Sequence, residues 1–521
     1  MEPTITTVDP TTPPQTTERD EWKDALQADY ERLLSVGEEC VTESELHALL
    51  LRHVRPNTDA TTKQPSRSII LYDGFEPSGR MHIAQGVYKA VNVNKCTQPL
   101  LASATGATAT TAPPPTFVFY VADWFALMND KMGGDLDKIQ TVGHYLQEVW
   151  QAAGMNLQHV QFCWASHEVT AQAATYWPLM LDVARRFNVT RIKKCGQIMG
   201  RHDHSLTAAQ IHYPLMQCTD VFFLKADICQ LGLDQRKVNM LAREYADAAR
   251  LPHNPIILSH HMLAGLLEGQ EKMSKSNPDS AIFMEDTVAD VQRKIQHAFC
   301  PKPPSSLTAA AAVMVAAEST TSPVTTTATD PDTALVSETT TTDAPKNPCL
   351  EFIQYIVLSP PGATFTTGGT VYTDFAAVRD DFYHDRLSKD QLKAGLIDAL
   401  NQLLEPVRQH FTHNARAKEL FDKVRQYKLE AAAATVRRLN LVSLGHVPAG
   451  SHLVLDSVPT GPTHVARSHG CTGTIASRDR TRTTHCVAFA RLGGHRLQRL
   501  ARRCQGLCRA LPNSALRSIR T

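Results

Sequence analysis

Residues 68–79 read Ser-Ile-Ile-Leu-Tyr-Asp-Gly-Phe-Glu-Pro-Ser-Gly, and residues 80–86 continue with Arg-Met-His-Ile-Ala-Gln-Gly. The apolar run at 68–75 is typical of a buried parallel strand. A turn at 76–79 follows, and residues 81–96 are expected to form a helix. A strand, a glycine-bearing turn and a helix together direct backbone N–H groups and the helix dipole at a phosphate. The stretch therefore predicts an α/β fold with a parallel sheet and a nucleotide site at the turn.

A second motif, the pentad Lys-Met-Ser-Lys-Ser at 272–276, lies about 190 residues after His82. Asn-Pro follows it and a glycine-containing stretch precedes it, so the pentad is expected in a loop. Lysine supplies a compact charge with three donors, and serine adds a neutral donor. The combination suits a loop that binds a polyphosphate as it leaves. Taken alone, such a pentad is as well explained by an ordinary solvated loop.

A third motif lies in the predicted helix 208–224. Tyr213, Gln217 and Asp220 are spaced i, i+4 and i+7, which places them on one helix face. Because their neighbours are mostly apolar, this face is expected to form the wall of a polar pocket. The alternative is a hydrogen-bonded trio in the core. A further short strand, a glycine turn and a helix are expected from residue 226 onwards.

These motifs together resemble tyrosyl-tRNA synthetases of the archaeal and eukaryotic branch, which are class I aminoacyl-tRNA synthetases. The cytosolic plant and protist forms match best, and the resemblance runs from about residue 20 to about residue 428. The segment around His82 is similar to the first class I signature, His-Ile-Gly-His, although Gln85 replaces its last histidine. The pentad is similar to the second signature. The motif Tyr-x-x-x-Gln-x-x-Asp, followed by Gly-x-Asp-Gln-Arg-Lys, is similar to the tyrosine-binding motif.

The resemblance implies roles for individual residues. It implies that Tyr72 and Asp220 bind the substrate hydroxyl, Tyr213 and Gln217 its amino group, and Gln235 lies near its carboxylate. It implies a catalytic set of His82, Gln85, Lys272 and Lys275 that stabilises charge on the phosphates. The implied ATP-binding residues are Gly79, His82, Gly232, Asp234, Lys272, Met273, Ser274, Lys275 and Ser276. Asp123 is expected to lie behind the residues that touch the substrate.

The predicted pocket itself favours tyrosine. Phenylalanine would leave the buried acceptor Asp220 and the Tyr72 hydroxyl unpaired, which costs free energy. Such a site rejects the analogue that lacks the hydroxyl and needs no editing domain. Two alternatives are a tryptophanyl-tRNA synthetase and a non-catalytic synthetase-like tRNA-binding protein. The polar end of the pocket disfavours the first, and the retained His82, Lys272 and Lys275 disfavour the second.

Composition agrees with a cytoplasmic enzyme. The 521 residues are 42% hydrophobic and 20% charged, which is typical of a soluble globular protein. No apolar run is long enough to span a membrane, and the N-terminus lacks the features of a targeting signal. The 12 cysteines include no Cys-x-x-Cys pair, so reduced thiols are expected and no metal site is predicted. The implied partners are L-tyrosine, ATP with Mg²⁺, and tRNA(Tyr).

The expected organisation begins with a disordered segment, 1–18. A Rossmann-like catalytic domain follows at 19–302, with a low-complexity insertion at 97–116. A low-complexity linker, 303–346, leads to a small α-helical anticodon-binding domain at 347–428. There the leucines from 392 to 404 have helical spacing. The resemblance further implies a homodimer that pairs through residues 117–153.

Two predictions concern the C-terminal part of the chain. Asp390 falls where relatives read the first anticodon base, although an aspartate at a helix start is equally explained by the helix dipole. Residues 431–521 contain 14 Arg, no Lys and two acidic residues. This charge could bind nucleic acid, but broken periodicity favours a disordered extension or the product of a misread gene end. The basic tail, 429–521, is therefore expected to be disordered.

Overall fold

The structure is a computed structural model that describes residues 17–54, 67–101, 113–198, 206–273, 277–302 and 346–445, and two short strands at 455–457 and 486–488. The chain divides into two compact units, 1–425 and 426–521. Within the described residues, no helix combines the length and the apolar character needed to cross a bilayer. The predictions for residues 1–16, for 102–112 of the insertion and for 303–345 of the linker lie outside the described residues.

A six-stranded sheet organises the first unit. Its central strand β2 (Ile70–Phe75) runs parallel to its neighbours β3 and β5, and Tyr72 pairs with Val118 on one side and Cys229 on the other. The edge strand β1 runs antiparallel to β6. This mostly parallel sheet confirms the predicted α/β fold. The strand order is β1 (Glu39–Cys40), β6 (Ile256–Ser259), β5 (Ile228–Cys229), β2, β3 (Thr116–Val121) and β4 (Val160–Trp164).

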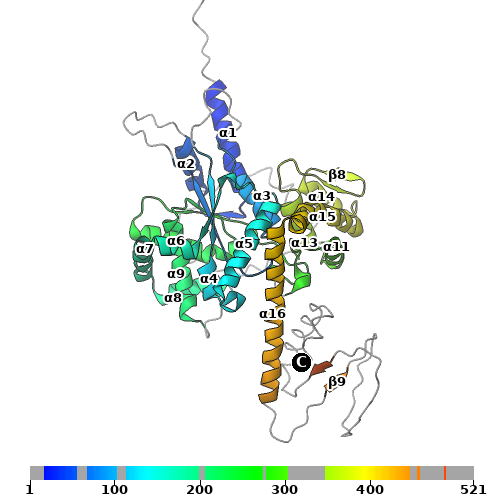
Figure 1. Ribbon diagram of the computed structural model, residues 1–521. Helices are drawn as coiled ribbons and strands as arrows, with labels where there is room; N and C mark the ends of the chain where they lie inside the picture. Colours follow the sequence, from blue (N-terminus) through cyan, green and yellow to red (C-terminus); the bar gives the residue numbers. More distant parts are fainter. Residues whose placement is uncertain are drawn as a thin grey trace, which may run out of the picture. The chain divides into compact units, whose positions relative to one another are not determined.

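Alternate residues of the strands face two separate cores. Leu71, Phe117 and Phe119 belong to one core, whereas Tyr72 and Tyr120 belong to the other, as the period of two in a strand requires. The first core is covered by α1 (Thr17–Leu34), α2 (Glu43–Val54), α3 (Val87–Cys96) and α5 (Leu136–Ala152), which surround the upper and right sides of the sheet in Figure 1. The second is covered by α4 (Asp123–Met128), α6 (Ala165–Ala171), α7 (Ala173–Arg186), α8 (Val189–Ile198), α9 (Ala208–Phe223) and α10 (Arg236–Ala249).

One predicted helix boundary is wrong. The helix expected at 81–96 begins only at Val87. The preceding residues are extended or in turns because His82 forms an antiparallel bridge with Phe283. The Ile83 N–H donates to the Ile282 carbonyl at 2.8 Å, and the Met284 N–H donates to the Met81 carbonyl at 3.0 Å. These tertiary hydrogen bonds replace the first helical turn.

The region after residue 287 is mainly helical and confirms the predicted leucine-rich helix. Leu392, Leu396, Leu400 and Leu404 are buried along α15, while Leu403 is only half-buried. A two-stranded hairpin, which the sequence did not predict, precedes this helix. The elements are α11 (Val288–His297), α13 (Pro348–Phe352), the π-helix Ile353–Val357, β7 (Phe365–Thr367), β8 (Thr370–Tyr372), α14 (Phe375–Tyr383), α15 (Lys389–His413) and α16 (Ala415–Gly445).

The expectation that the chain is disordered from residue 429 is wrong for its first part. Helix α16 continues through the alanines at 431–434 to Gly445, and alanine has the strongest intrinsic preference for a helix. Further along, β9 (Leu455–Ser457) and β10 (Cys486–Ala488) pair antiparallel. The rest of the tail lies outside the described residues. The domain boundaries given above stay predictions.

Candidate active site

The candidate site residues, predicted and newly found, gather at the carboxyl ends of the parallel strands. Glu76 follows β2, Asp123 follows β3, and Gly232 lies three residues after β5. Ligands of open α/β sheets bind at this edge because the loops that leave the strands converge there. Helix α9 supplies Tyr213, Gln217 and Asp220 on its buried side.

Asp220 lies at the deepest point of this site. Its side chain is fully buried, and its Oδ1 accepts a hydrogen bond of 2.9 Å from the Tyr176 hydroxyl of α7. Its Oδ2 has no hydrogen-bond partner among the described residues. Burial raises the pKa of Asp220 well above its usual range, although the hydroxyls of Tyr176 and Tyr120 oppose the rise. The carboxyl group therefore has one oxygen held in place and one available to a ligand.

Three tyrosines surround this carboxyl group. Tyr72 of β2 and Tyr120 of β3 are both buried, and their ring centroids lie 6.5 Å apart. Burial raises the pKa of Tyr72, and the charge of Asp220 raises it further. The Tyr120 hydroxyl lies beside Asp220 but makes no well-aligned hydrogen bond within the described part of the chain. The structure thus brings Tyr72 and Asp220 into one cluster. Tyr120 and Tyr176 also belong to this cluster, and the sequence did not predict them.

A second polar group lies at the other end of the α9 face. The Tyr213 hydroxyl donates to Glu76 Oε1 at 2.6 Å, and Lys131 Nζ lies 3.8 Å from Glu76 Oε2. The Gln217 side-chain amide donates to Gln235 Oε1 at 3.3 Å. Gln217 Oε1 is buried and finds no partner among the residues that the structure describes. Tyr213, Gln217 and Gln235 therefore lie together, and oxygens of Gln217 and Glu76 can accept from an ammonium group.

The turn after β2 carries Gly79, His82 and Gln85, for which the sequence predicted contact with ATP or its phosphates. Gly79 has φ +125°, a conformation that side-chain-bearing residues rarely adopt. His82 is half-buried and bridged to Phe283. The carbonyl of Gln85 accepts from Trp150 Nε1 at 2.8 Å, while its side-chain Oε1 has no partner in the described ranges. The turn is thus fixed through its backbone, and Gln85 Oε1 is available to a ligand.

Two other predicted segments complete this end of the site. A Cβ added to Gly232 would lie 2.8 Å from Asp234 Oδ1, so the Asp234 carboxylate lies close over the backbone of this turn. In the pentad, Lys272 is exposed and Met273 is packed in the first core. The predictions for Ser274, Lys275 and Ser276 lie outside the described residues.

Asp123 and Asp390 occupy very different surroundings. Asp123 is fully buried and accepts from the Ser166 hydroxyl at 2.6 Å, the Ser166 N–H at 3.0 Å and Gln140 Nε2 at 3.1 Å. Its acceptors are occupied, which agrees with a place behind the substrate site. Asp390 is exposed in the first turn of α15, next to the capping box of Ser388 and Gln391. Its position therefore fits both explanations given for it.

Behind the site, a buried ion pair joins β2 to α3. Lys89 Nζ lies 2.5 Å from Asp73 Oδ2 and donates to the Gln230 carbonyl at 2.8 Å. Burial raises the pKa of Asp73 to about 6, although Lys89 lowers it. The sequence did not predict this pair, nor a role for Glu76 or Tyr176. The signal for Glu76 was an acidic residue directly after a parallel strand, whereas no sequence pattern connects Tyr176 with Asp220.

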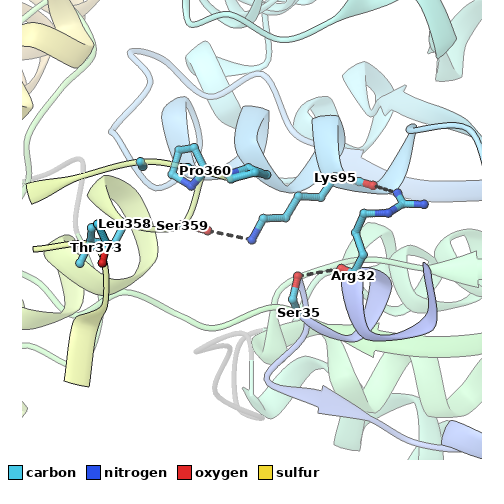
Figure 2. A pocket seen from close by; sticks show the side chains of 10 residues that line it. Arg32, Ser35, Lys95, Leu358, Ser359, Pro360 and Thr373 are labelled. Carbon is cyan, nitrogen blue, oxygen red and sulfur yellow. Dashed lines mark hydrogen bonds between the residues drawn. The ribbon is translucent and has the colours of Figure 1, made fainter. Parts of the chain in front are cut away.

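A cavity of about 370 Å³ lies between α1, the end of α3 and the loop at 358–363 (Figure 2). Lys95 Nζ donates to Ser359 Oγ across it at 3.2 Å, and Arg32 donates to the Lys95 carbonyl. None of the predicted site residues lines this cavity. It is therefore separate from the proposed tyrosine and ATP sites.

Comparison with known proteins places the chain in a family. The family model "tRNA synthetases class I (W and Y)" matches residues 63–305. The protein named tyrosine–tRNA ligase 1, cytoplasmic, of Arabidopsis thaliana is 45% identical over 408 residues, which cover 77% of this chain and 89% of that protein.

Solved structures of tyrosyl-tRNA synthetases are also similar to this chain. The Leishmania major tyrosyl-tRNA synthetase in complex with tyrosinol is 51% identical with a TM-score of 0.63, and the match covers 77% of this chain but only 53% of that one. The Pyrococcus horikoshii enzyme complexed with L-tyrosine is 25% identical with a TM-score of 0.57, over 76% of this chain and 99% of that one. With the strand-end site described above, these similarities show that the chain belongs to the tyrosine–tRNA ligases, a family of class I aminoacyl-tRNA synthetases.

Proposed function

We propose that this protein is a cytoplasmic tyrosine–tRNA ligase that works in two steps. The tyrosine carboxylate attacks the α-phosphorus of ATP, which gives tyrosyl-adenylate and pyrophosphate. The 3′-terminal ribose hydroxyl of tRNA(Tyr) then takes the tyrosyl group. The observation that carries the substrate assignment is the buried Asp220 carboxyl, whose Oδ2 has no partner among the described residues while Tyr72 and Tyr120 lie beside it. A phenol hydroxyl can donate to that oxygen, and phenylalanine cannot.

The amino end of the substrate would lie along the same helix face. An ammonium group is a donor only, and Gln217 Oε1 and the Glu76 carboxylate are acceptors on that side. Tyr213 and Gln235 fix these two side chains through the hydrogen bonds described above. The cytoplasmic compartment follows the name of the Arabidopsis relative.

The ATP phosphates would bind at the turn after β2 and at the pentad. His82, Gln85, Lys272 and Lys275 would stabilise the charge that develops on the transferring and leaving phosphates, so positioning and electrostatics carry the chemistry. Among the described residues, no three His, Cys, Asp or Glu side chains are grouped as metal ligands. Mg²⁺ in nucleotide sites is held largely by phosphates and water, so we propose that it arrives as part of the Mg·ATP substrate.

The remaining partners are also proposals. Asp390 in the first turn of α15 would accept from an anticodon base, because a carboxylate pairs with an amino group on a base edge. The homodimer would form through residues 117–153. Leu127 of α4, which is 38% exposed, is an apolar side chain in this stretch that a partner subunit could cover.

Amino-acid-dependent exchange of pyrophosphate into ATP tests this function. The purified chain should exchange with tyrosine and show far weaker exchange with tryptophan or phenylalanine. Exchange driven by tryptophan would make the chain a tryptophanyl-tRNA synthetase despite its polar pocket. Loss of exchange with every amino acid, from a folded protein, would identify a non-catalytic synthetase-like protein.

A further inference from the structure

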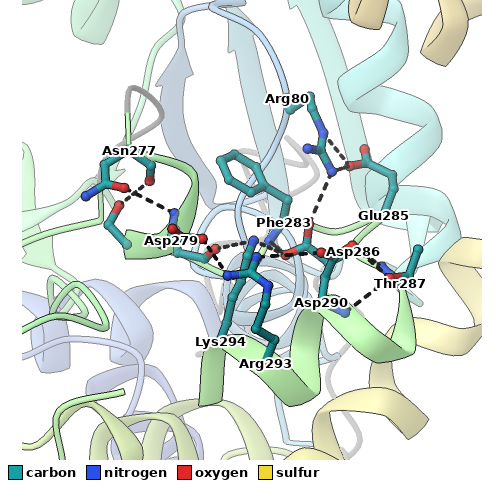
Figure 3. A network of polar contacts seen from close by, with 12 residues as sticks. Arg80, Asn277, Asp279, Phe283, Glu285, Asp286, Thr287, Asp290, Arg293 and Lys294 are labelled. Carbon is teal, nitrogen blue, oxygen red and sulfur yellow. Dashed lines mark hydrogen bonds and ion pairs between the residues drawn. The ribbon is translucent and has the colours of Figure 1, made fainter. Parts of the chain in front are cut away.

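An ion-pair cluster joins the turn after β2 to the segment that follows the pentad (Figure 3). Nε and Nη2 of Arg80 lie 3.2 and 3.1 Å from Glu285 Oε2, and Nη2 lies 3.4 Å from Asp286 Oδ1. The two carboxylates are 4% and 5% exposed, and Arg80 is 21% exposed. The sequence distance between the partners exceeds 200 residues, so the cluster connects two distant parts of the chain.

The backbone joins the same two segments. His82 is bridged to Phe283, and the hydrogen bonds described above link Met81 and Ile83 to residues 282–284. A Cβ added to Gly86 would lie 2.2 Å from Met284 Sδ, which shows how closely the two segments approach. The pentad ends at residue 276, and only residues 277–281 separate it from this segment. A shift of residues 282–286 would therefore move His82 and the base of the pentad loop together.

Arg80 is the cation that balances Glu285. Asp286 has its own partner, because Lys294 Nζ lies 2.5 Å from Asp286 Oδ2. Burial raises the pKa of Glu285, and Arg80 lowers it. The Arg80 guanidinium also lies over the Phe283 ring, 4.6 Å from its centroid. Removal of Arg80 would leave a buried carboxyl group without its ion-pair partner, which is strongly unfavourable.

The helical region holds the cluster from the other side. Arg408 Nε of α15 donates to the Asp286 carbonyl at 2.8 Å, and its Nη2 donates to Asn401 Oδ1 at 2.7 Å. Helix α15 is the element that carries Asp390 in its first turn. The cluster therefore ties the two signature segments to each other and to this helix.

We propose that Arg80 is a positioning residue for the activation of tyrosine. Through Glu285 and Asp286, it holds the turn that carries His82 in a fixed relation to residues 282–286, which follow the pentad in the chain. Arg80 itself need not touch the substrate. This role rests on the proposed function, because it concerns the step in which ATP and tyrosine react.

Arg80→Met tests the role against a matched control, Arg293→Met. Arg293 belongs to the same network (Figure 3) but pairs with Asp279 at 2.8 Å on the surface, where both side chains are about half exposed. Arg80→Met should lower the kcat of tyrosine-dependent pyrophosphate exchange by about 10- to 100-fold, since small misplacements of reacting groups cost up to about 100-fold. The KM for tyrosine should not change, because the pocket around Asp220 lies in the other core. Arg293→Met should behave as the parent in both parameters.

A double-mutant cycle tests whether Arg80 acts through Glu285. If the two side chains act as a pair, Glu285→Gln adds no further loss of kcat to Arg80→Met. Additive losses, or a raised KM in place of a lowered kcat, would overturn the positioning role. If Arg80→Met does not fold, Arg80→Lys serves instead, because it keeps the charge but loses the planar two-donor contact. A parental kcat in Arg80→Lys would then count against the proposal.

The parent protein separates this inference from the function on which it rests. A parent without tyrosine-dependent exchange overturns the proposed function and the role of Arg80 with it. An active parent whose Arg80 variants keep the parental kcat overturns the positioning role alone.

Discussion

The Tyr176 hydroxyl donates a hydrogen bond of 2.9 Å to Asp220 Oδ1, and both side chains are fully buried. The bond occupies one oxygen of the carboxyl group and fixes its plane, so that Oδ2 has a defined direction. A ligand hydroxyl then meets an acceptor that is already oriented. Preorganisation of this kind favours the ligand that can donate, because the acceptor need not reorder on binding.

Tyr176→Phe should weaken the binding of tyrosine but not of phenylalanine. Loss of the oriented acceptor should raise the KM for tyrosine by about fivefold, since a typical hydrogen bond contributes about 1 kcal/mol. Steady-state exchange kinetics with both amino acids measure the effect. Tyr245→Phe is the matched control, because Tyr245 donates to Asp182 at 2.9 Å, outside the site. An equal loss for both amino acids would mean that Tyr176 only supports the packing.

Asp220→Ala should reduce the selectivity for tyrosine over phenylalanine. The variant loses the acceptor for the substrate hydroxyl, and a buried polar group left without a partner costs about 1–3 kcal/mol. The ratio of kcat/KM for the two amino acids should fall by about 10- to 100-fold. If the ratio stays at the parental value while both rates fall, Asp220 does not bind the hydroxyl.

Lys89→Met should destabilise the protein in a pH-dependent way. Removing one partner of a buried ion pair typically costs about 3–5 kcal/mol. The Asp73 pKa is about 6 in the folded protein and about 3.9 in an unfolded chain. Between these values the folded state binds more protons, so the contribution of Asp73 to stability falls as the pH rises from about 4 to about 6.

Without Lys89, the pKa of Asp73 should rise further, because the cation that lowers it is gone. The stability of the variant should therefore continue to fall above pH 6, where the contribution of Asp73 in the parent is constant. Urea unfolding between pH 6 and pH 8 should show that the difference in free energy of unfolding between the parent and Lys89→Met grows with pH. The double variant Asp73→Asn/Lys89→Met lacks both charges, so its difference from the parent in free energy of unfolding should stay constant over the same pH range. If the stabilities of Lys89→Met and the parent change in parallel with pH, Lys89 does not lower the pKa of Asp73.

The sequence predicted those parts of the site that follow from local periodicity. The face of α9 with Tyr213, Gln217 and Asp220, and the strand before Glu76, depend on helix and strand spacing that can be read directly. The start of α3 was wrong because tertiary hydrogen bonds to residues 282–284 override a helical pattern. Tyr176 and Lys89 were missed for a related reason. Their partners are distant in the sequence, and only the packing of the helices on the sheet brings them together.

Asp390→Ala should impair tRNA charging while pyrophosphate exchange stays at the parental level. Asp390 is exposed in the first turn of α15, so its removal should not disturb the core or the strand-end site. Asp398→Ala is a matched control, since Asp398 is an exposed aspartate on the same helix. Aminoacylation and exchange assays separate the two steps. Equal loss in both assays would mean that Asp390 stabilises the helix start rather than binding the anticodon.

Deletion of residues 446–521 should leave tyrosine activation and tRNA charging nearly unchanged at physiological salt. All predicted site residues lie in the unit that ends at residue 425, and a cut after Gly445 preserves α16 as the structure describes it. Residues 431–521 hold 14 Arg and two acidic residues, so the tail can add non-specific affinity for tRNA. That contribution should appear at low salt and fade as salt is added, because phosphate contacts release counterions. The measurement is the KM for tRNA of the full and shortened chains at both salt concentrations. A large loss of tRNA charging that persists at physiological salt would show that the tail binds tRNA specifically or supports the fold.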